Sequence, residues 1–205
     1  MIIIGLLGGI ASGKSLVAEQ LCQLGAGLLD GDRAGHEVLR LTDVRQLVRE
    51  RWGDGVFGPD GQVDRKALGR TVFDPSPEGR RELECLEAIT HPRITERLRQ
   101  QAANLAAEGR AVAVLDAPVM LKAGWDKFCN HIVFVEAPQE MRQARALARG
   151  WRQEDIAVRE SAQEPISIKR TRADRVIDNS GSREQTRAQV ERLWRELIEP
   201  STPDV

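Results

Sequence analysis

The segment from Gly8 to Ser15 reads GGIASGKS, and it constrains the fold of this chain more than any other stretch. It fits the pattern G-x-x-x-x-G-K-S of a phosphate-binding loop. Glycines let the backbone turn its N–H groups inward as a nest for an anion. Lys14 supplies a positive charge for the β- and γ-phosphates of a nucleotide, and Ser15 supplies a hydroxyl for Mg²⁺. The residues expected to bind the nucleotide are Gly8, Gly9, Ile10, Ala11, Ser12, Gly13, Lys14 and Ser15.

The segments on either side of this loop decide between a ligand site and a plain glycine-rich turn. Residues 2–7 form a short apolar run that predicts a buried parallel strand. Residues 15–24 suit a helix, which would direct the positive end of its dipole at the phosphates. A strand before the loop and a helix after it are what the motif requires, so the sequence favours phosphate binding.

The composition describes an ordinary globular chain of 205 residues, a length that fits one domain. The net charge of −1 gives no argument for nucleic acid or an anionic membrane as a partner. No apolar run approaches the ~20 residues of a membrane span. The three cysteines have no metal-binding or redox spacing, which favours reduced thiols in the cytoplasm. We expect a cytoplasmic monomer or weak homo-oligomer.

Two carboxylates follow the second predicted strand, residues 25–29. Asp30 and Asp32 would lie at the carboxyl end of that strand, where open α/β sheets bind ligands. One carboxylate could accept a proton from an attacking hydroxyl, while the other holds a cation or a substrate group. Asp32 is the better candidate for the base, because it lies farther along the chain. The alternative is that Asp32 only caps a helix that begins at Arg33.

A third predicted strand, residues 111–115, also ends in a carboxylate, Asp116. Enzymes with a phosphate loop place an acidic residue at the end of such a strand, where it holds Mg²⁺. The sequence therefore makes Asp116 a magnesium candidate, with a loop-capping aspartate as the alternative. Residues 131–135 predict a further parallel strand.

The stretch between the second and third strands has only helical patterns and turns, and it is longer than a crossover requires. We expect part of it to be an inserted cap that holds the second substrate. Ser76 is expected to cap a helix that begins at Pro77. The sequence Thr90-His91-Pro92 predicts an interruption of that helix. His91 could face a substrate or belong to the core, and its spacing alone favours the core.

Three arginines follow the strand at residues 131–135, within a predicted helix over residues 139–150. The spacing of Arg142, Arg145 and Arg149 puts them on one face. Residues 139–175 hold nine basic and six acidic residues, a local excess of +3 in a nearly neutral chain. We interpret this region as a lid over phosphates, with Arg145 and Arg149 as the contacts. The alternative is a solvated charged face.

The C-terminal region carries the last predicted strand and the last predicted helix. Residues 175–177 predict a last strand, and Ser182 with Gln185 resembles a capping box before a final helix. Residues 200–205 are expected to be a frayed tail.

Motifs spread over nearly the whole chain resemble the dephospho-coenzyme A kinase family. Beside the phosphate loop, the matching segments are Asp30-Gly31-Asp32, residues 61–73, residues 86–94, the spacing of Arg145, Arg149, Arg159 and Gln163, and residues 173–181. The loop alone is generic, but this ordered set is specific. The chain departs from the family pattern at Gly31, His36 and Lys122, where relatives usually have Ala, Arg and Glu.

The resemblance implies transfer of the ATP γ-phosphate to the 3′-hydroxyl of dephospho-coenzyme A, with Mg²⁺, in the last step of coenzyme A synthesis. It implies an α/β fold, a three-layer parallel sheet of the P-loop nucleoside and nucleotide kinase type. One domain over residues 1–199 would comprise a core (about 1–32, 108–138 and 173–199), a helical coenzyme-binding insert (about 33–107) and a helical lid (about 139–172).

The resemblance also implies roles for single residues. The expected catalytic residues are Asp32, Lys14 and Arg145. The expected ATP contacts beyond the loop are Arg149 and Asn179, the substrate contacts are Asp30, Asp32, Arg65 and His91, and the magnesium ligands are Ser15 and Asp116. A shikimate-type kinase resembles the chain less, because it has a run of glycines where this chain has Asp116-Ala117-Pro118. A GTPase-type switch would need an N-K-x-D segment, which is not present. A nucleic-acid-binding ATPase would need a basic, aromatic-bearing surface, whereas this chain is nearly neutral and only 4% aromatic.

Overall fold

A computed structural model describes residues 1–161 and 163–198. These residues form two compact units, which we describe separately. The first unit joins Met1–Asp30 to the described residues from Gln101 onward, and the second is Gly31–Gln100. The tail expected at residues 200–205 lies outside the described residues.

The first unit contains a sheet of five strands in the order β2-β3-β1-β4-β5, in which every neighbouring pair is parallel. Its strands are β1 (Ile2–Gly8), β2 (Gly27–Asp30), β3 (Val112–Asp116), β4 (His131–Glu136) and β5 (Arg175–Asp178). All five lie where apolar runs predicted strands, so the expected α/β class with a parallel sheet is confirmed.

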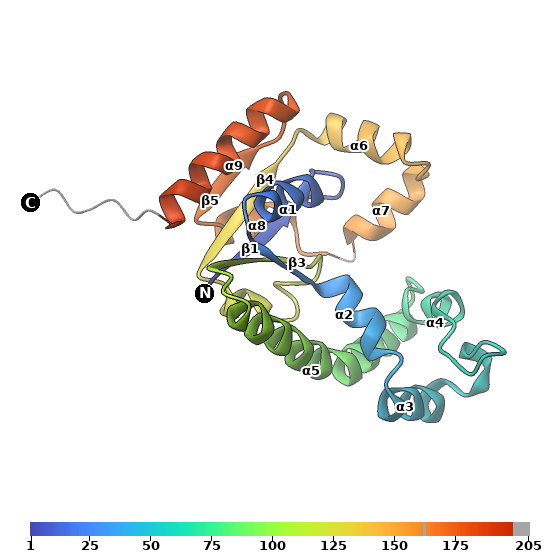
Figure 1. The fold of residues 1–205 in the computed structure, drawn as a ribbon. Helices are drawn as coiled ribbons and strands as arrows, with labels where there is room; N and C mark the ends of the chain where they lie inside the picture. The colour runs from blue at the N-terminus through green and yellow to red at the C-terminus, as the bar shows by residue number, and fades with distance from the viewer. Residues whose placement is uncertain (162, 199–205) are drawn as a thin grey trace, which may run out of the picture. The chain divides into compact units, whose positions relative to one another are not determined.

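One face of this sheet packs on α1 (Lys14–Gln23) and α9 (Arg183–Ile198), which contact each other and lie side by side in Figure 1. Alternate strand residues such as Ile4 and Val114 join Leu21 of α1 and Val190 of α9 in one apolar cluster, and these four residues are 0% exposed. This burial is the main stabilisation of the unit, at roughly 1.5–3 kcal/mol for each large apolar side chain.

Gly5 lies where β1 closely approaches the segment between β3 and β4 that contains Met120 and Cys129. A Cβ at Gly5 would lie 2.7 Å from Cys129 Sγ and 2.8 Å from Met120 Sδ, so the side chains leave no room for a larger residue. That segment contains η2 (Trp125–Phe128), and α8 (Ile166–Arg172) also contacts β1 and β4. The unit further contains α6 (Gln139–Ala148) and α7 (Gln153–Ser161).

The start of α9 has the capping box that the sequence predicts. The Ser182 backbone N–H donates to Gln185 Oε1 at 2.8 Å, and the Gln185 N–H donates to Ser182 Oγ at 3.3 Å. These reciprocal bonds satisfy N–H groups that a helix N-terminus otherwise leaves without an acceptor.

The second unit is helical, with one isolated antiparallel bridge between Phe57 and Val63. Its elements are α2 (Gly31–Val38), α3 (Thr42–Trp52), η1 (Asp54–Val56), α4 (Arg65–Val72) and most of α5 (Pro77–Ala107). α2 ends at Val38, and α3 begins separately at Thr42.

The interruption expected at Pro92 is not present, because α5 runs through the proline without a break. Pro92 has no N–H for the helix ladder. Two carbonyls near it receive additional side-chain donors: Thr90 Oγ1 donates to the Leu86 carbonyl at 2.8 Å, and Arg93 donates to the Ile89 carbonyl at 2.7 Å. These bonds support the backbone of the turns around the proline.

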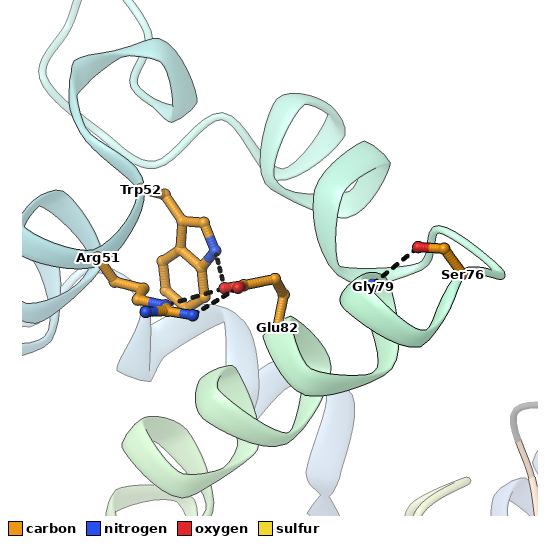
Figure 2. A network of polar contacts seen from close by, with 5 residues as sticks. All are labelled: Arg51, Trp52, Ser76, Gly79 and Glu82. Atoms are coloured by element: carbon orange, nitrogen blue, oxygen red, sulfur yellow. Dashed lines mark hydrogen bonds and ion pairs between the residues drawn. The ribbon is translucent and has the colours of Figure 1, made fainter.

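Glu82 of α5 fixes the C-terminal end of α3 (Figure 2). Its carboxylate accepts two hydrogen bonds from Arg51 and one, at 2.8 Å, from Trp52 Nε1. At the start of α5, the Ser76 hydroxyl accepts from the Gly79 N–H at 3.1 Å, as the capping pattern predicts.

None of the helices formed by residues 1–161 and 163–198 combines the length and the apolar character that crossing a membrane requires.

Candidate active site

The phosphate loop leaves β1 and enters α1, as its motif requires. Ala11 and Gly13 both have positive φ, at 56° and 103°. Gly13 also lies where a Cβ would collide with the side-chain amide of Asn179, so glycine is needed there for two reasons. A Cβ at Gly9 would lie 2.6 Å from the Arg142 guanidinium. These close approaches show that the loop is shaped by side chains packed directly against its backbone.

Three alternate carbonyls of this loop are bound by side chains from later in the chain. The Gly8 carbonyl accepts from Lys169 at 3.5 Å, and the Ile10 carbonyl accepts from Arg142 at 3.4 Å. The Ser12 carbonyl accepts from Asn179 at 2.7 Å and from Arg145 at 3.4 Å. We call Lys169, Arg142, Arg145 and Asn179 the carbonyl clamp. Three of its members are cationic, so the clamp also places positive charge around the loop.

Asn179 connects most of this arrangement. Its Oδ1 accepts from Thr186 Oγ1 at 2.9 Å, while its own carbonyl accepts from Arg145 at 2.9 Å. Its backbone N–H donates to the Glu136 carbonyl at 2.8 Å, and its side chain is 4% exposed. Asn179 therefore joins the end of β5, the arginine helix and the phosphate loop.

The structure separates the three arginines of α6, which the sequence grouped on one face. Arg142 is buried and donates to Glu160 at 2.7 Å as well as to the loop. Arg145 is half-buried against the loop, whereas Arg149 is exposed at the C-terminal end of the helix. The alternative of a solvated charged face therefore does not hold for Arg142 and Arg145, because both bind loop carbonyls.

Two of the predicted carboxylates lie side by side. Asp30 and Asp116 are register partners at the carboxyl ends of β2 and β3, and Asp116 is also opposite Leu6 of β1, two residues before the loop begins. Asp32 belongs to the helical unit. It is exposed within the first turn of α2, which begins at Gly31, so Asp32 does not precede the helix as the capping alternative required.

The two other substrate candidates also lie in the helical unit. Arg65 is the exposed first residue of α4, and His91 is half-buried in α5. Asp64 caps α4 by accepting from the N–H groups of Lys66 and Ala67, at 2.8 and 3.2 Å. These two bonds, that from Ala67 first, are the main cause of the lowered pKa of the Asp64 carboxyl. The sequence signal for this cap is an aspartate directly before the first residue of the helix.

Sequence reasoning also missed Lys169, which it counted only as one of nine basic residues. Burial, together with the positive charge of Lys14, lowers the pKa of the Lys169 ammonium to about 8. The spacing from Gln163 to Lys169 does not by itself reveal that Lys169, within α8, reaches the Gly8 carbonyl of the phosphate loop.

The loop fits a phosphate-bearing nucleotide on two observations. Ser12 Oγ is buried and has no hydrogen-bond partner among the described residues, so a polar group is left unsatisfied inside the loop. The clamp holds carbonyls that would otherwise repel an anion, and the N-terminus of α1 attracts one. Among the described residues, no group of three or more His, Cys, Asp or Glu residues could hold a metal by itself. Mg²⁺ in such enzymes needs only one or two protein ligands besides the phosphates.

The parallel sheet and the loop between β1 and α1 define a P-loop kinase fold. The family model described as dephospho-CoA kinase matches residues 2–185. The chain therefore belongs to the dephospho-CoA kinase family, and its activity is that of a dephospho-CoA kinase in coenzyme A biosynthesis. Membership of this kinase family implies the use of ATP.

Individual proteins support the same assignment. The chain is 44% identical over 198 residues to a dephospho-CoA kinase of Symbiobacterium thermophilum, covering 95% of this chain and 81% of the relative. The crystal structure of TT1252 from Thermus thermophilus has a TM-score of 0.81 and 33% identity, covering 96% and 98% of the two chains. The dephospho-CoA kinase structure from Campylobacter jejuni has a TM-score of 0.71 at 23% identity and 98% coverage of each chain, which shows the shared fold.

Proposed function

We propose that the protein transfers the γ-phosphate of ATP to the 3′-hydroxyl of dephospho-coenzyme A. The observation that carries this proposal is the phosphate loop, in which the chain's own donors bind three carbonyls and leave a buried Ser12 hydroxyl unsatisfied. A loop that is already shaped loses little entropy when it binds a triphosphate, and phosphoryl transfer depends chiefly on positioning and charge.

On the nucleotide side, we propose that Lys14 binds the β- and γ-phosphates and that Arg145 stabilises the charge of the transferring group. Arg145 is suited to this because the Ser12 and Asn179 carbonyls hold its guanidinium against the loop. Arg149 is exposed and would contact ATP from the end of α6. Asn179 has its amide nitrogen and oxygen bound within the protein, which supports a role in shaping the loop.

Mg²⁺ would be held by the hydroxyl of Ser15 and the carboxylate of Asp116. When bound, the ion neutralises charge on the β- and γ-phosphates. Asp116 is suited to this place because its strand ends beside β1, which leads directly into the loop. Asp30, its register partner, would orient the substrate or assist in holding the ion.

For the acceptor, we propose that Asp32 takes the proton from the 3′-hydroxyl as the oxygen attacks the γ-phosphorus. The bond between the γ-phosphorus and the oxygen that bridges it to the β-phosphate breaks, and ADP leaves with that oxygen. Asp32 suits this role because its carboxylate is exposed and its oxygens are hydrogen-bond acceptors. The helical unit, with Arg65 and His91, would bind the rest of dephospho-coenzyme A, and residues about 139–172 would act as the lid.

A coupled assay tests the proposal directly. It uses ATP and Mg²⁺ with dephospho-coenzyme A, shikimate and a nucleoside monophosphate as parallel acceptors. We expect phosphorylation of dephospho-coenzyme A, with the new phosphate located on the 3′-oxygen by phosphorus NMR. Phosphorylation of another acceptor instead would overturn the proposal. Monomeric or weakly associating behaviour and a cytoplasmic location remain predictions, which light scattering and cell fractionation can check.

A further inference from the structure

Lys169 is a buried cation that forms no ion pair with a carboxylate in the part of the chain that the structure describes. Its side chain is 4% exposed, and Nζ donates to Gln163 Oε1 at 2.6 Å and to the Gly8 carbonyl at 3.5 Å. Both acceptors are uncharged, and within residues 1–161 and 163–198 no carboxylate forms an ion pair with this ammonium. A buried charge without an opposite charge beside it is costly, and an anionic ligand can supply the compensating charge.

The charges around Lys169 do not supply the missing partner. Lys14 and Arg142 oppose the protonated form, whereas Glu164 and Glu160 favour it. Glu160 already pairs with Arg142 at 2.7 Å, so part of its charge is neutralised. Burial and Lys14 outweigh the two glutamates, which is why the pKa of the Lys169 ammonium falls to about 8 instead of rising.

We propose that Lys169 is a positioning residue of the phosphate loop, which holds the Gly8 carbonyl and receives its counter-charge from the phosphates of the bound nucleotide. This inference rests on the proposed function, namely that the loop binds ATP. It assigns to α8 an electrostatic part in nucleotide binding, because α8 carries Lys169 and contacts β1, the strand that leads into the loop.

A change in proton binding follows from this arrangement. Phosphates near the ammonium favour its charged form, so the pKa of Lys169 rises above about 8 when ATP binds. At about pH 7 and below, Lys169 is mostly protonated with or without nucleotide, and the affinity is high. As the pH rises past the pKa of the bound form, the ammonium is lost in both states, and affinity falls tenfold for each unit by which the nucleotide raised the pKa.

Isothermal titration calorimetry measures this effect without turnover. Magnesium–ATP is titrated into the full chain, without dephospho-coenzyme A, in pairs of buffers that differ in ionisation enthalpy. If ATP binding raises the pKa of Lys169 by one unit, we expect Lys169 to take up about half a proton per bound ATP at pH 8.5. Lys169→Gln should abolish this uptake, raise the ATP dissociation constant about tenfold at pH 7, and raise KM for ATP more than it lowers kcat.

Two further variants separate the charge from the packing. Lys169→Arg keeps the charge at every pH used, so it should bind ATP without the uptake and with a flat affinity between pH 7 and 9. It also keeps the test open if Lys169→Gln does not fold, which circular dichroism will reveal. Lys127→Gln removes an exposed lysine of η2 and should behave as the unchanged protein.

The outcomes are distinct. If the unchanged protein binds ATP without uptake at pH 8.5, or if Lys169→Gln retains the uptake, the inference about Lys169 is wrong while the proposed function stands. If the unchanged protein does not bind ATP under any of these conditions, the proposed function itself fails.

Discussion

The side-chain amide of Asn179 donates a 2.7 Å hydrogen bond to the carbonyl of Ser12, a residue 167 positions earlier in the chain. Both residues are almost fully buried, at 4% and 1% exposure. The bond fixes the orientation of the peptide before Gly13, whose positive φ ends the loop and begins α1. The last strand of the sheet thereby controls the geometry of the first loop.

Replacing Asn179 by aspartate tests this bond with little change in shape. In Asn179→Asp, a carboxylate oxygen faces the Ser12 carbonyl in place of the donor, and a negative charge is added beside a loop for phosphates. We expect KM for ATP to rise at least tenfold and the free energy of unfolding to fall by about 1–3 kcal/mol. Steady-state kinetics and urea unfolding measure both quantities. A variant with unchanged KM would show that the bond does not shape the nucleotide site.

Gly13→Ala should damage the loop more than the same change at another left-handed glycine. A Cβ at Gly13 collides with the amide of Asn179, whereas one at Gly109, with φ of 79°, meets nothing within 4 Å. Gly109→Ala should cost only the strain of a left-handed residue, roughly 1–2 kcal/mol, and leave kinetics unchanged. Gly13→Ala should lower kcat/KM for ATP by at least tenfold. Equal behaviour of the two variants would contradict the steric argument.

Arg145 and Arg149 should differ in their effects on catalysis. Arg145 is bound to the Ser12 carbonyl of the loop and to the Asn179 carbonyl, and an arginine that stabilises the transition state is worth ~10³–10⁵ in rate. Arg145→Ala should therefore lower kcat more than it raises KM for ATP, and Arg149→Ala should have the smaller effect because its side chain is exposed. Full activity in both variants would remove α6 from the mechanism.

Lys14→Ala should abolish turnover with an unchanged circular dichroism spectrum.

Asp32→Asn and Asp30→Asn should be compared for catalysis, because each keeps the shape and removes the basic group. We expect Asp32→Asn to lower kcat by ~10²–10⁴, with little change in the dissociation constants of the two substrates. A slower Asp30→Asn enzyme would reverse the two roles, and unchanged rates in both variants would make the pair structural.

Glu82 should make the helical unit sensitive to acid. Hydrogen bonds from Arg51 are the main cause of the lowered pKa of the Glu82 carboxyl in the folded protein, and Trp52 adds to it. The stabilisation is therefore present above the unfolded pKa, near 4.3, and is lost as the pH falls through the lower folded value. Glu82→Gln should reduce the loss of stability between about pH 5 and pH 3, as measured by urea unfolding. An unchanged acid profile would show that the network in Figure 2 is not coupled to folding.

The sheet and the phosphate loop could be predicted from the sequence because their signals are local. Each strand is an apolar run, and the loop motif combines glycine geometry with charge over eight residues. The capping of α9 by Ser182 and Gln185 was likewise predicted and is confirmed.

The carbonyl clamp could not be predicted, because it joins the loop to residues more than 130 positions away. Helical spacing placed Arg142 and Arg149 on one face, but it could not show that one end of α6 is buried and the other exposed. The continuity of α5 through Pro92 was missed for a related reason. A proline disfavours helical geometry at the residue before it, but side-chain donors at Thr90 and Arg93 support the neighbouring turns.

The pairing of the strands also determines how this protein can form on the ribosome. β1 pairs with β3 and β4, and β2 pairs with β3, so Ile2 finds its partner only when Val112 has been made. The helical unit Gly31–Gln100 is synthesised completely before then. Until that moment, the first two strands are apolar segments with unpaired edges, and such segments are prone to aggregation. A nascent chain stopped before residue 112 should therefore need a chaperone that a chain stopped after residue 198 does not.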